Sequence, residues 1–146
     1  MRVEEIDAAS CWDLRARVLR DGTPSTDPRF PEDSQPGTFH LGAFDPDGRL
    51  MAVVTLAAQP TPLRPASNAA QLRGMATEPA VRGQGYGQAL VMVAVERLRS
   101  AGVEVVWARA RDGALGFYER VGFLVEGEGY VTAETGLRHH TVVLDL

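Results

Sequence analysis

Apolar residues recur along this chain in short alternating or helically spaced groups, which predicts several short strands and a few helices. The first strand is expected at residues 3–6. Ser10 follows as the predicted N-cap of a helix. The next apolar positions fall near helical spacing, at Trp12, Leu14, Val18 and Leu19. The chain is therefore expected to open with a strand and then a helix.

Further helices and strands are predicted downstream. The longest helix is expected at residues 85–101, and a shorter one at residues 114–121 with Asp112 as its cap and Gly122 at its end. Apolar residues share one face of the longer helix: Tyr86, Leu90, Ala94, Leu98 and Ala101. The strands are expected at residues 38–44, 50–56, 70–77, 103–108, 123–130 and 139–144, with a hairpin turn at 45–49.

Two proline-rich segments, residues 21–37 and 59–68, interrupt this pattern. The first contains four prolines and is expected to form a loop or a short helical turn. Its charged residues give a net charge of −3: Asp21, Asp27, Arg29, Glu32 and Asp33. Such a segment could meet a cationic ligand, such as a polyamine or an aminoglycoside, although an acidic surface also promotes solubility.

Length and composition fit one globular domain spanning residues 1–146. Fifteen arginines, no lysine and 19 acidic residues give a net charge of −4, which argues against nucleic acid as a partner. Cys11 is the single cysteine, so no internal disulfide is possible, and no spacing of Cys and His indicates a metal site. The longest apolar runs are too short to span a membrane, and no export signal is visible, which predicts a cytoplasmic protein.

The clearest chemistry lies in a glycine-rich turn between the strand at 70–77 and the long helix. Glycines at 83, 85 and 87 let a ligand approach the backbone, the free N–H groups of the first helical turn suit a pyrophosphate, and Arg82 can pair with its oxygens. A P-loop is excluded because it requires a lysine. A dinucleotide fingerprint fits poorly, because Gln88 stands where its third glycine belongs. The alternative to a phosphate-binding site is a glycine-rich turn that only lets the strand and the helix pack together.

Two segments resemble signature motifs of the GNAT superfamily of N-acyltransferases. Arg82-Gly83-Gln84-Gly85-Tyr86-Gly87 is similar to the acyl-CoA signature Arg/Gln-x-x-Gly-x-Gly/Ala, and residues 114–123 (ALGFYERVGF) are similar to the second hallmark. The motifs stand in the family's order, and the resemblance spans residues 38–146. It implies a single-domain α/β fold with one mixed, mostly antiparallel sheet of six or seven strands and helices on both faces.

The resemblance also implies an N-acetyltransferase that moves an acetyl group from acetyl-CoA to a primary amine of a small molecule or peptide, with no metal, as a monomer or homodimer. Tyr118 matches the family's general acid, since a phenol can donate a hydrogen bond to the departing thiolate. Arg111 stands where many members have an asparagine that contacts pantetheine. Arg109 and Arg111 could instead reach a cofactor phosphate, and two solvated surface arginines are the alternative. The implied acetyl-CoA contacts are Met75, Ala76, Thr77, Arg82, Gly83, Gln84, Gly85, Tyr86, Gly87, Arg111 and Tyr118.

A general base must also take a proton from the acceptor, because an alkylammonium has no free lone pair at neutral pH. Family members often place a glutamate on the strand before the turn. Here alternation puts four residues without an acid on that face: Gln71, Arg73, Met75 and Thr77. Substitute bases are Glu78, Asp33, His40, His140, Glu134 and His139.

Glu134 and His139 are favoured as the base, because residues 134–139 (ETGLRH) resemble a C-terminal Glu-x-Gly-x-x-His element of one bacterial subgroup. The sequence therefore predicts Tyr118, Glu134 and His139 as catalytic residues. The missing strand glutamate keeps a second hypothesis open, a non-catalytic acyl-CoA sensor. A dinucleotide-binding module is the third hypothesis.

Overall fold

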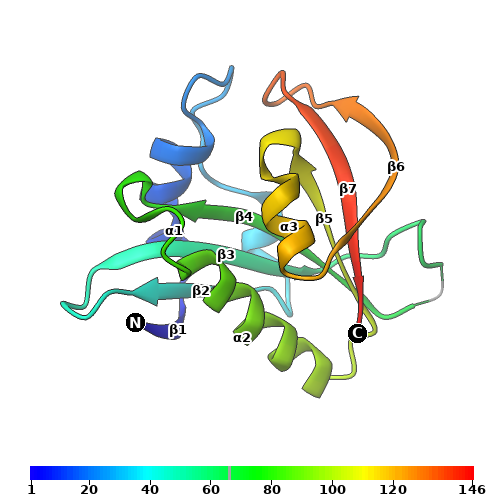
Figure 1. Cartoon of the computed structure of the whole chain (residues 1–146), viewed down its shortest axis with the longest axis horizontal. Coiled ribbons are helices and arrows are strands. Elements are labelled where there is room, and N and C mark those ends of the chain that lie inside the picture. The colour runs from blue at the N-terminus through cyan, green and yellow to red at the C-terminus, as the bar shows by residue number, and fades with distance from the viewer. Residues whose placement is uncertain (66) are drawn as a thin grey trace.

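The computed structural model describes residues 1–65 and 67–146, which form one seven-stranded sheet with three α-helices (Figure 1). The strands lie in the order β1-β2-β3-β4-β5-β7-β6. Their bounds are β1 (Arg2–Ile6), β2 (Phe39–Phe44), β3 (Leu50–Ala58), β4 (Ala69–Thr77), β5 (Val105–Arg111), β6 (Leu124–Val131) and β7 (Arg138–Asp145). The α-helices are α1 (Ala8–Leu14), α2 (Tyr86–Ser100) and α3 (Leu115–Arg120). Within the described ranges, no helix has the length and apolar character needed to cross a bilayer.

The sheet is mixed and mostly antiparallel, which confirms the predicted fold class. β4 and β5 run parallel, and the other neighbouring strands pair antiparallel. Every predicted strand and helix has a counterpart whose bounds differ by a few residues. The predicted hairpin turn is held by Asp45, whose carboxylate accepts hydrogen bonds from the backbone N–H groups of Asp47 and Arg49.

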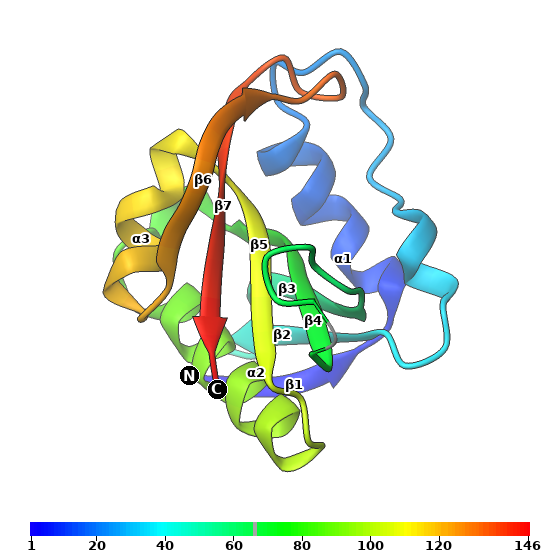
Figure 2. The ribbon, with the colours of Figure 1, turned by 90° about the vertical axis from the view of Figure 1, so that its right-hand side faces the viewer.

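Helices cover both faces of the sheet (Figure 2). α1 lies on one face, where Cys11 and Leu14 pack with Val53 and Ala76 in a small apolar cluster. α2 and α3 lie on the opposite face, above the main core that contains Leu90. Because a helix of this length is marginal alone in water, the burial of one apolar side of α2 is what stabilises it.

Two predicted helix caps and one predicted buried position are wrong. Asp7 caps α1 in place of Ser10, since its carboxylate accepts a hydrogen bond from the Ser10 N–H at 2.9 Å. Asp112 begins a 3₁₀ turn before α3, and its carboxylate accepts a hydrogen bond from His140 Nδ1 at 2.7 Å. Ala101 is the exposed C-cap of α2 and does not join the buried face. Asp and Ser side chains can form hydrogen bonds with several nearby groups, and the sequence pattern does not show which of these bonds forms.

β4 and β5 pair at their beginnings and then diverge. The last parallel pair joins Gln71 to Trp107. β4 contains a β-bulge, shown by a shift in its register with β3 between the pairs that flank Gly74. A bulge bends the strand that carries it. Gly74 has a left-handed backbone (φ 65°), and an added Cβ would lie 2.7 Å from the Phe30 ring. The space between the two diverging strands is where the candidate site forms.

Candidate active site

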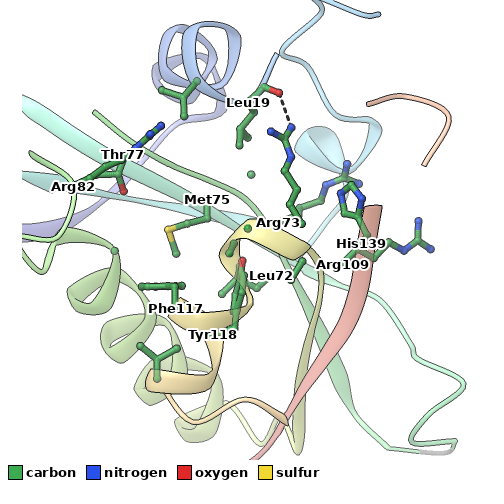
Figure 3. Close-up of a pocket in the computed structure, with 18 of the residues that line it drawn as sticks. Leu19, Leu72, Arg73, Met75, Thr77, Arg82, Arg109, Phe117, Tyr118 and His139 are labelled. Atoms are coloured by element: carbon green, nitrogen blue, oxygen red, sulfur yellow. Dashed lines mark hydrogen bonds between the residues drawn. The ribbon is translucent and has the colours of Figure 1, made fainter. Parts of the chain in front are cut away.

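A cavity of about 940 Å³ opens where β4 and β5 diverge (Figure 3). Its walls come from these strands, the start of α2, α3, the segment after α1 and the turn between β6 and β7. Most predicted site residues line it: Met75, Thr77, Arg82, Gly83, Gly85, Tyr86, Gly87, Arg111, Tyr118, Glu134 and His139. The fold therefore brings together residues that are far apart in the sequence.

The glycine-rich turn presents backbone donors to one end of the cavity. Gly85 is the N-cap of α2 with a left-handed backbone (φ 91°), and no side chain caps this helix. The N–H groups of the first turn are therefore available to an anion, which the helix dipole also favours. Gly87 has a packing role that the sequence did not reveal, because an added Cβ would lie 3.3 Å from the Phe117 ring. Its missing side chain lets α2 and α3 approach each other.

The bulge in β4 reverses the side-chain alternation within the strand. Simple alternation predicts that Arg73 and Met75 share a face, and this prediction is wrong. Arg73 contacts Phe30 on the α1 side of the sheet. Met75 packs against the main core on the α2 side. The two side chains therefore meet different parts of the cavity.

Two predicted acetyl-CoA contacts have side chains outside the cavity lining. Ala76 packs with Cys11 and Leu14 beneath α1, so only its backbone is available to a ligand. Gln84 is exposed to solvent. Among the described residues, β4 has no β5 partner after Gln71, which leaves this edge of the strand open to an added extended chain.

Tyr118 projects from α3 into the cavity, and Figure 3 shows its hydroxyl directed inward. Its ring packs edge-on against Phe117 and Phe123, with ring centroids 5.3 Å apart in both pairs. The residue is 6% exposed, and burial raises the pKa of the hydroxyl above its usual value. The phenol is therefore protonated at neutral pH and can act as a hydrogen-bond donor.

His139 lies on β7 and is 5% exposed at the cavity wall. Its Nδ1 lies 2.9 Å from the carbonyl oxygen of Leu137, and the ring of Tyr130 stacks on the imidazole with centroids 6.0 Å apart. Because a carbonyl oxygen can only accept, Nδ1 carries the proton in this hydrogen bond. When the ring is neutral, its free lone pair is then on Nε2, and this atom can accept a proton.

Of the remaining candidate bases, one lines the cavity and four do not. Glu134 lines the cavity from the exposed turn that precedes β7. Four others are absent from the described lining and have partners elsewhere: Asp33 with Arg15, His40 with Thr55, Glu78 with Arg17 and His140 with Asp112. The described residues include no group of three or more Cys, His, Asp or Glu placed to hold a metal ion.

Arg111 is tied to the segment after α1. Its Nη2 donates a hydrogen bond to the Leu19 carbonyl at 2.6 Å, and burial, with the nearby charge of Arg20, lowers its pKa. Sequence reasoning did not identify Arg20 or Phe30 as residues of the cavity, which they line, whereas alternation had placed Arg73 on the strand face where the base was sought. Their placement depends on the register of β4 and on the path of the loop after α1, neither of which the sequence pattern shows.

The acidic segment 21–37 carries less free charge than its composition suggests. Three of its carboxylates pair with arginines: Asp27 with Arg29, Glu32 with Arg73 and Asp33 with Arg15. The Asp33 and Glu32 pairs have mostly buried acidic partners. This finding removes most of the support that the segment gave to a cationic acceptor.

A model of the acetyltransferase (GNAT) family matches residues 8–123, so the chain belongs to this family, whose acyl donor is acetyl-CoA. A relative, the uncharacterized N-acetyltransferase YitI of Bacillus subtilis (strain 168), is 33% identical over 143 residues, which cover 98% of this chain and 94% of that protein. An acyl-CoA N-acyltransferase from Pseudomonas aeruginosa has a similar fold, with a TM-score of 0.76 at 21% identity over 98% of this chain and 99% of that one. An aminoglycoside 6'-N-acetyltransferase complexed with coenzyme A has a TM-score of 0.71 at 15% identity, over 99% and 97%.

Proposed function

We propose that this protein transfers an acetyl group from acetyl-CoA to a primary amine of a small molecule or peptide by direct attack of the amine. One observation carries the proposal. A single cavity joins the uncapped start of α2, the open edge of β4, the Tyr118 hydroxyl and the His139 ring. Holding both reactants in one cleft can supply a large part of the rate.

The residues around the cavity fit acetyl-CoA. The first N–H groups of α2, presented by Gly83 and Gly85, suit a pyrophosphate, and exposed Arg82 adds a positive charge beside them. The free edge of β4 from Met75 to Thr77 suits the extended pantetheine arm. Acetyl-CoA, when bound, would supply the acetyl group as a thioester whose leaving group is a thiolate.

His139 is the proposed general base. Its Nε2 would accept a proton from the acceptor ammonium, which gives the amine nitrogen the lone pair that it needs to attack. The hydrogen bond from Nδ1 to Leu137 would hold the ring in the required tautomer. Glu134 is the second candidate, because it lies on the same wall of the cavity.

Tyr118 is the proposed general acid. Its hydroxyl would donate a hydrogen bond to the sulfur as the carbon–sulfur bond breaks and would deliver the proton that forms the thiol. The second proton, which the nitrogen loses as the amide forms, would restore the phenol. Burial raises the pKa of Tyr118, while a thiol has a pKa of about 8.5. Donation of the hydrogen bond as charge develops therefore contributes more than complete proton transfer.

The test is thiol release from acetyl-CoA with a broad panel of amines, compared with an amine-free control. Tyr118→Phe should lower kcat by about 10²-fold with the KM for acetyl-CoA nearly unchanged, because only the hydroxyl is lost. Ser100→Ala is the matched control, since it removes an exposed hydroxyl at the end of α2, outside the cavity lining. Its turnover should equal that of the unmodified protein.

Two outcomes would contradict the proposal. Unchanged turnover in Tyr118→Phe would remove Tyr118 from the chemistry. Binding of acetyl-CoA, measured by calorimetry, without thiol release for any amine would overturn amine acetylation and favour the sensor hypothesis.

A further inference from the structure

Arginine side chains gather at the end of the cavity opposite the glycine-rich turn. Figure 3 shows Arg73 and Arg109 near His139, with Arg82 of the turn on the other side of the cavity. Among the described lining residues, Glu134 is the single carboxylate. Positive charge therefore prevails at this end of the cavity, although the whole chain has a net charge of −4.

The topology of the sheet explains why these two arginines lie together. Gln71 and Trp107 form the last parallel pair of β4 and β5, and Arg73 and Arg109 each follow two residues later. Residues two apart on a strand point to the same face, so both side chains leave the sheet on one face where the strands separate. Neither arginine belongs to the glycine-rich motif or to the second motif.

Arg73 keeps binding capacity despite its existing contacts. Its Nη1 lies 2.9 Å from Glu32 Oε1, and its guanidinium lies over the Phe30 ring at 4.0 Å from the centroid. Its Nε is buried and has no hydrogen-bond partner among the described residues. Burial lowers the pKa of Arg73, the charges of Glu32 and Glu134 oppose this shift, and the like charges of Arg15 and Arg109 add to it. An added anion would offset the like charges of Arg15 and Arg109.

Arg109 has even fewer partners. It is exposed, and the described residues offer its guanidinium neither an ion pair nor a hydrogen bond. Its guanidinium carbon lies 5.7 Å from the centroid of the Trp107 ring. A guanidinium presents its donors in a planar fork that matches the oxygens of a carboxylate or phosphate. Arg109 is therefore positioned to bind an anion from solvent.

We infer that the acceptor is an anionic amine, whose carboxylate or phosphate group Arg73 and Arg109 bind while its amino group lies toward Tyr118 and His139. This inference rests on the proposed acetyl transfer, and it names the substrate class of the same cavity. It replaces the cationic acceptor that the acidic segment suggested, because Glu32 and Asp33 of that segment are already paired with arginines. The excess positive charge would also attract such an acceptor from solution.

The experiment compares matched amines that differ by one anionic group. The first arm pairs each common L-amino acid with its amide, the second pairs glucosamine 6-phosphate with glucosamine, and spermidine serves as the cationic amine. Acetyl-CoA thiol release gives kcat/KM for each. The anionic member of at least one pair should be preferred by about tenfold or more, the effect expected for a charge-assisted hydrogen bond. The arm that shows the preference separates a carboxylate from a phosphate.

Variants then connect the preference to the arginines. Arg109→Gln should remove most of the preference by raising the KM for the anionic amine, with the KM for acetyl-CoA unchanged. Arg109→Glu should shift the preference toward spermidine. Arg73→Lys, which keeps the charge and loses the planar fork, should show a smaller effect than Arg109→Gln. Arg99→Gln, at an exposed position on α2 outside the cavity lining, is the matched control and should behave as the unmodified protein.

The outcomes separate this inference from the proposed function. Efficient acetylation of uncharged or cationic amines, with no change in Arg109→Gln, would overturn the anionic acceptor and leave the transferase in place. Calorimetry with coenzyme A present supplies a readout without turnover. Binding of an anionic amine that Arg109→Gln abolishes, without acetyl transfer, would support the arginine site and refute the transferase. Failure of every anionic amine to bind or react would overturn the inference.

Discussion

Asp33→Asn tests how the loop after α1 is held against the sheet, because it removes the counter-charge of a buried arginine. Arg15 has no exposed surface. Its guanidinium donates hydrogen bonds to Asp33 at 2.8 and 3.0 Å, to Thr55 Oγ1 at 2.6 Å and to the Pro28 carbonyl at 3.0 Å. The substitution leaves this cation desolvated with neutral partners only. Breaking one side of a buried pair costs about 3–5 kcal/mol, so a loss of that size in unfolding free energy is expected.

Urea unfolding followed by circular dichroism measures this loss. Asp27→Asn is the matched control, since Asp27 lies in the same segment and pairs with Arg29 on the surface. Exposed pairs contribute little, so its midpoint should barely move. Arg15→Met combined with Asp33→Asn should recover part of the loss, because no unpaired charge is then buried.

The pH dependence gives a second readout of the same pair. Burial raises the pKa of Asp33, but hydrogen bonds from Arg15 and the Phe30 N–H outweigh it, and the net pKa lies below the usual 3.8. A carboxyl with a lower pKa in the folded state stabilises the fold above its unfolded pKa, and this contribution is lost as pH falls through the folded pKa. Stability should therefore decline below about pH 4, less steeply in Asp33→Asn. Equal midpoints for Asp33→Asn and Asp27→Asn, or identical acid profiles, would refute the reasoning.

Substitutions at the glycine-rich turn and at the candidate base provide the remaining tests. Gly85→Ala should destabilise the fold by about 1–2 kcal/mol, because its N-cap backbone is left-handed, whereas Gly116→Ala inside α3 should stabilise it by about 0.5–1 kcal/mol. Thermal unfolding compares them, and shifts of the same sign would contradict the argument. His139→Gln should lower kcat by about 10²-fold in the thiol-release assay, and a larger loss in Glu134→Gln would assign the base to the glutamate instead.

The bounds of elements whose apolar residues recur at regular spacing could be predicted from the sequence to within a few residues. The α2 helix begins and ends within one residue of its predicted bounds, because its apolar residues recur on one face and glycine follows it. The bulge in β4 was missed, although a glycine inside a strand pattern is a known signal for one. Because Gly74 was not recognised as the site of a bulge, simple alternation placed Arg73 and Met75 on the same face.

The sign of the charge that meets the acceptor was the least predictable feature, and the reason is physical. Counting charges within the segment 21–37 treats every carboxylate as free, whereas ion pairs form between residues distant in the sequence. Asp33 and Glu32 are paired with Arg15 from the segment after α1 and Arg73 from β4. What a ligand meets is the charge left after such pairing, and in the described cavity that remainder includes the unpaired guanidinium of Arg109. A segment that is acidic in sequence can therefore border a site that favours an anion.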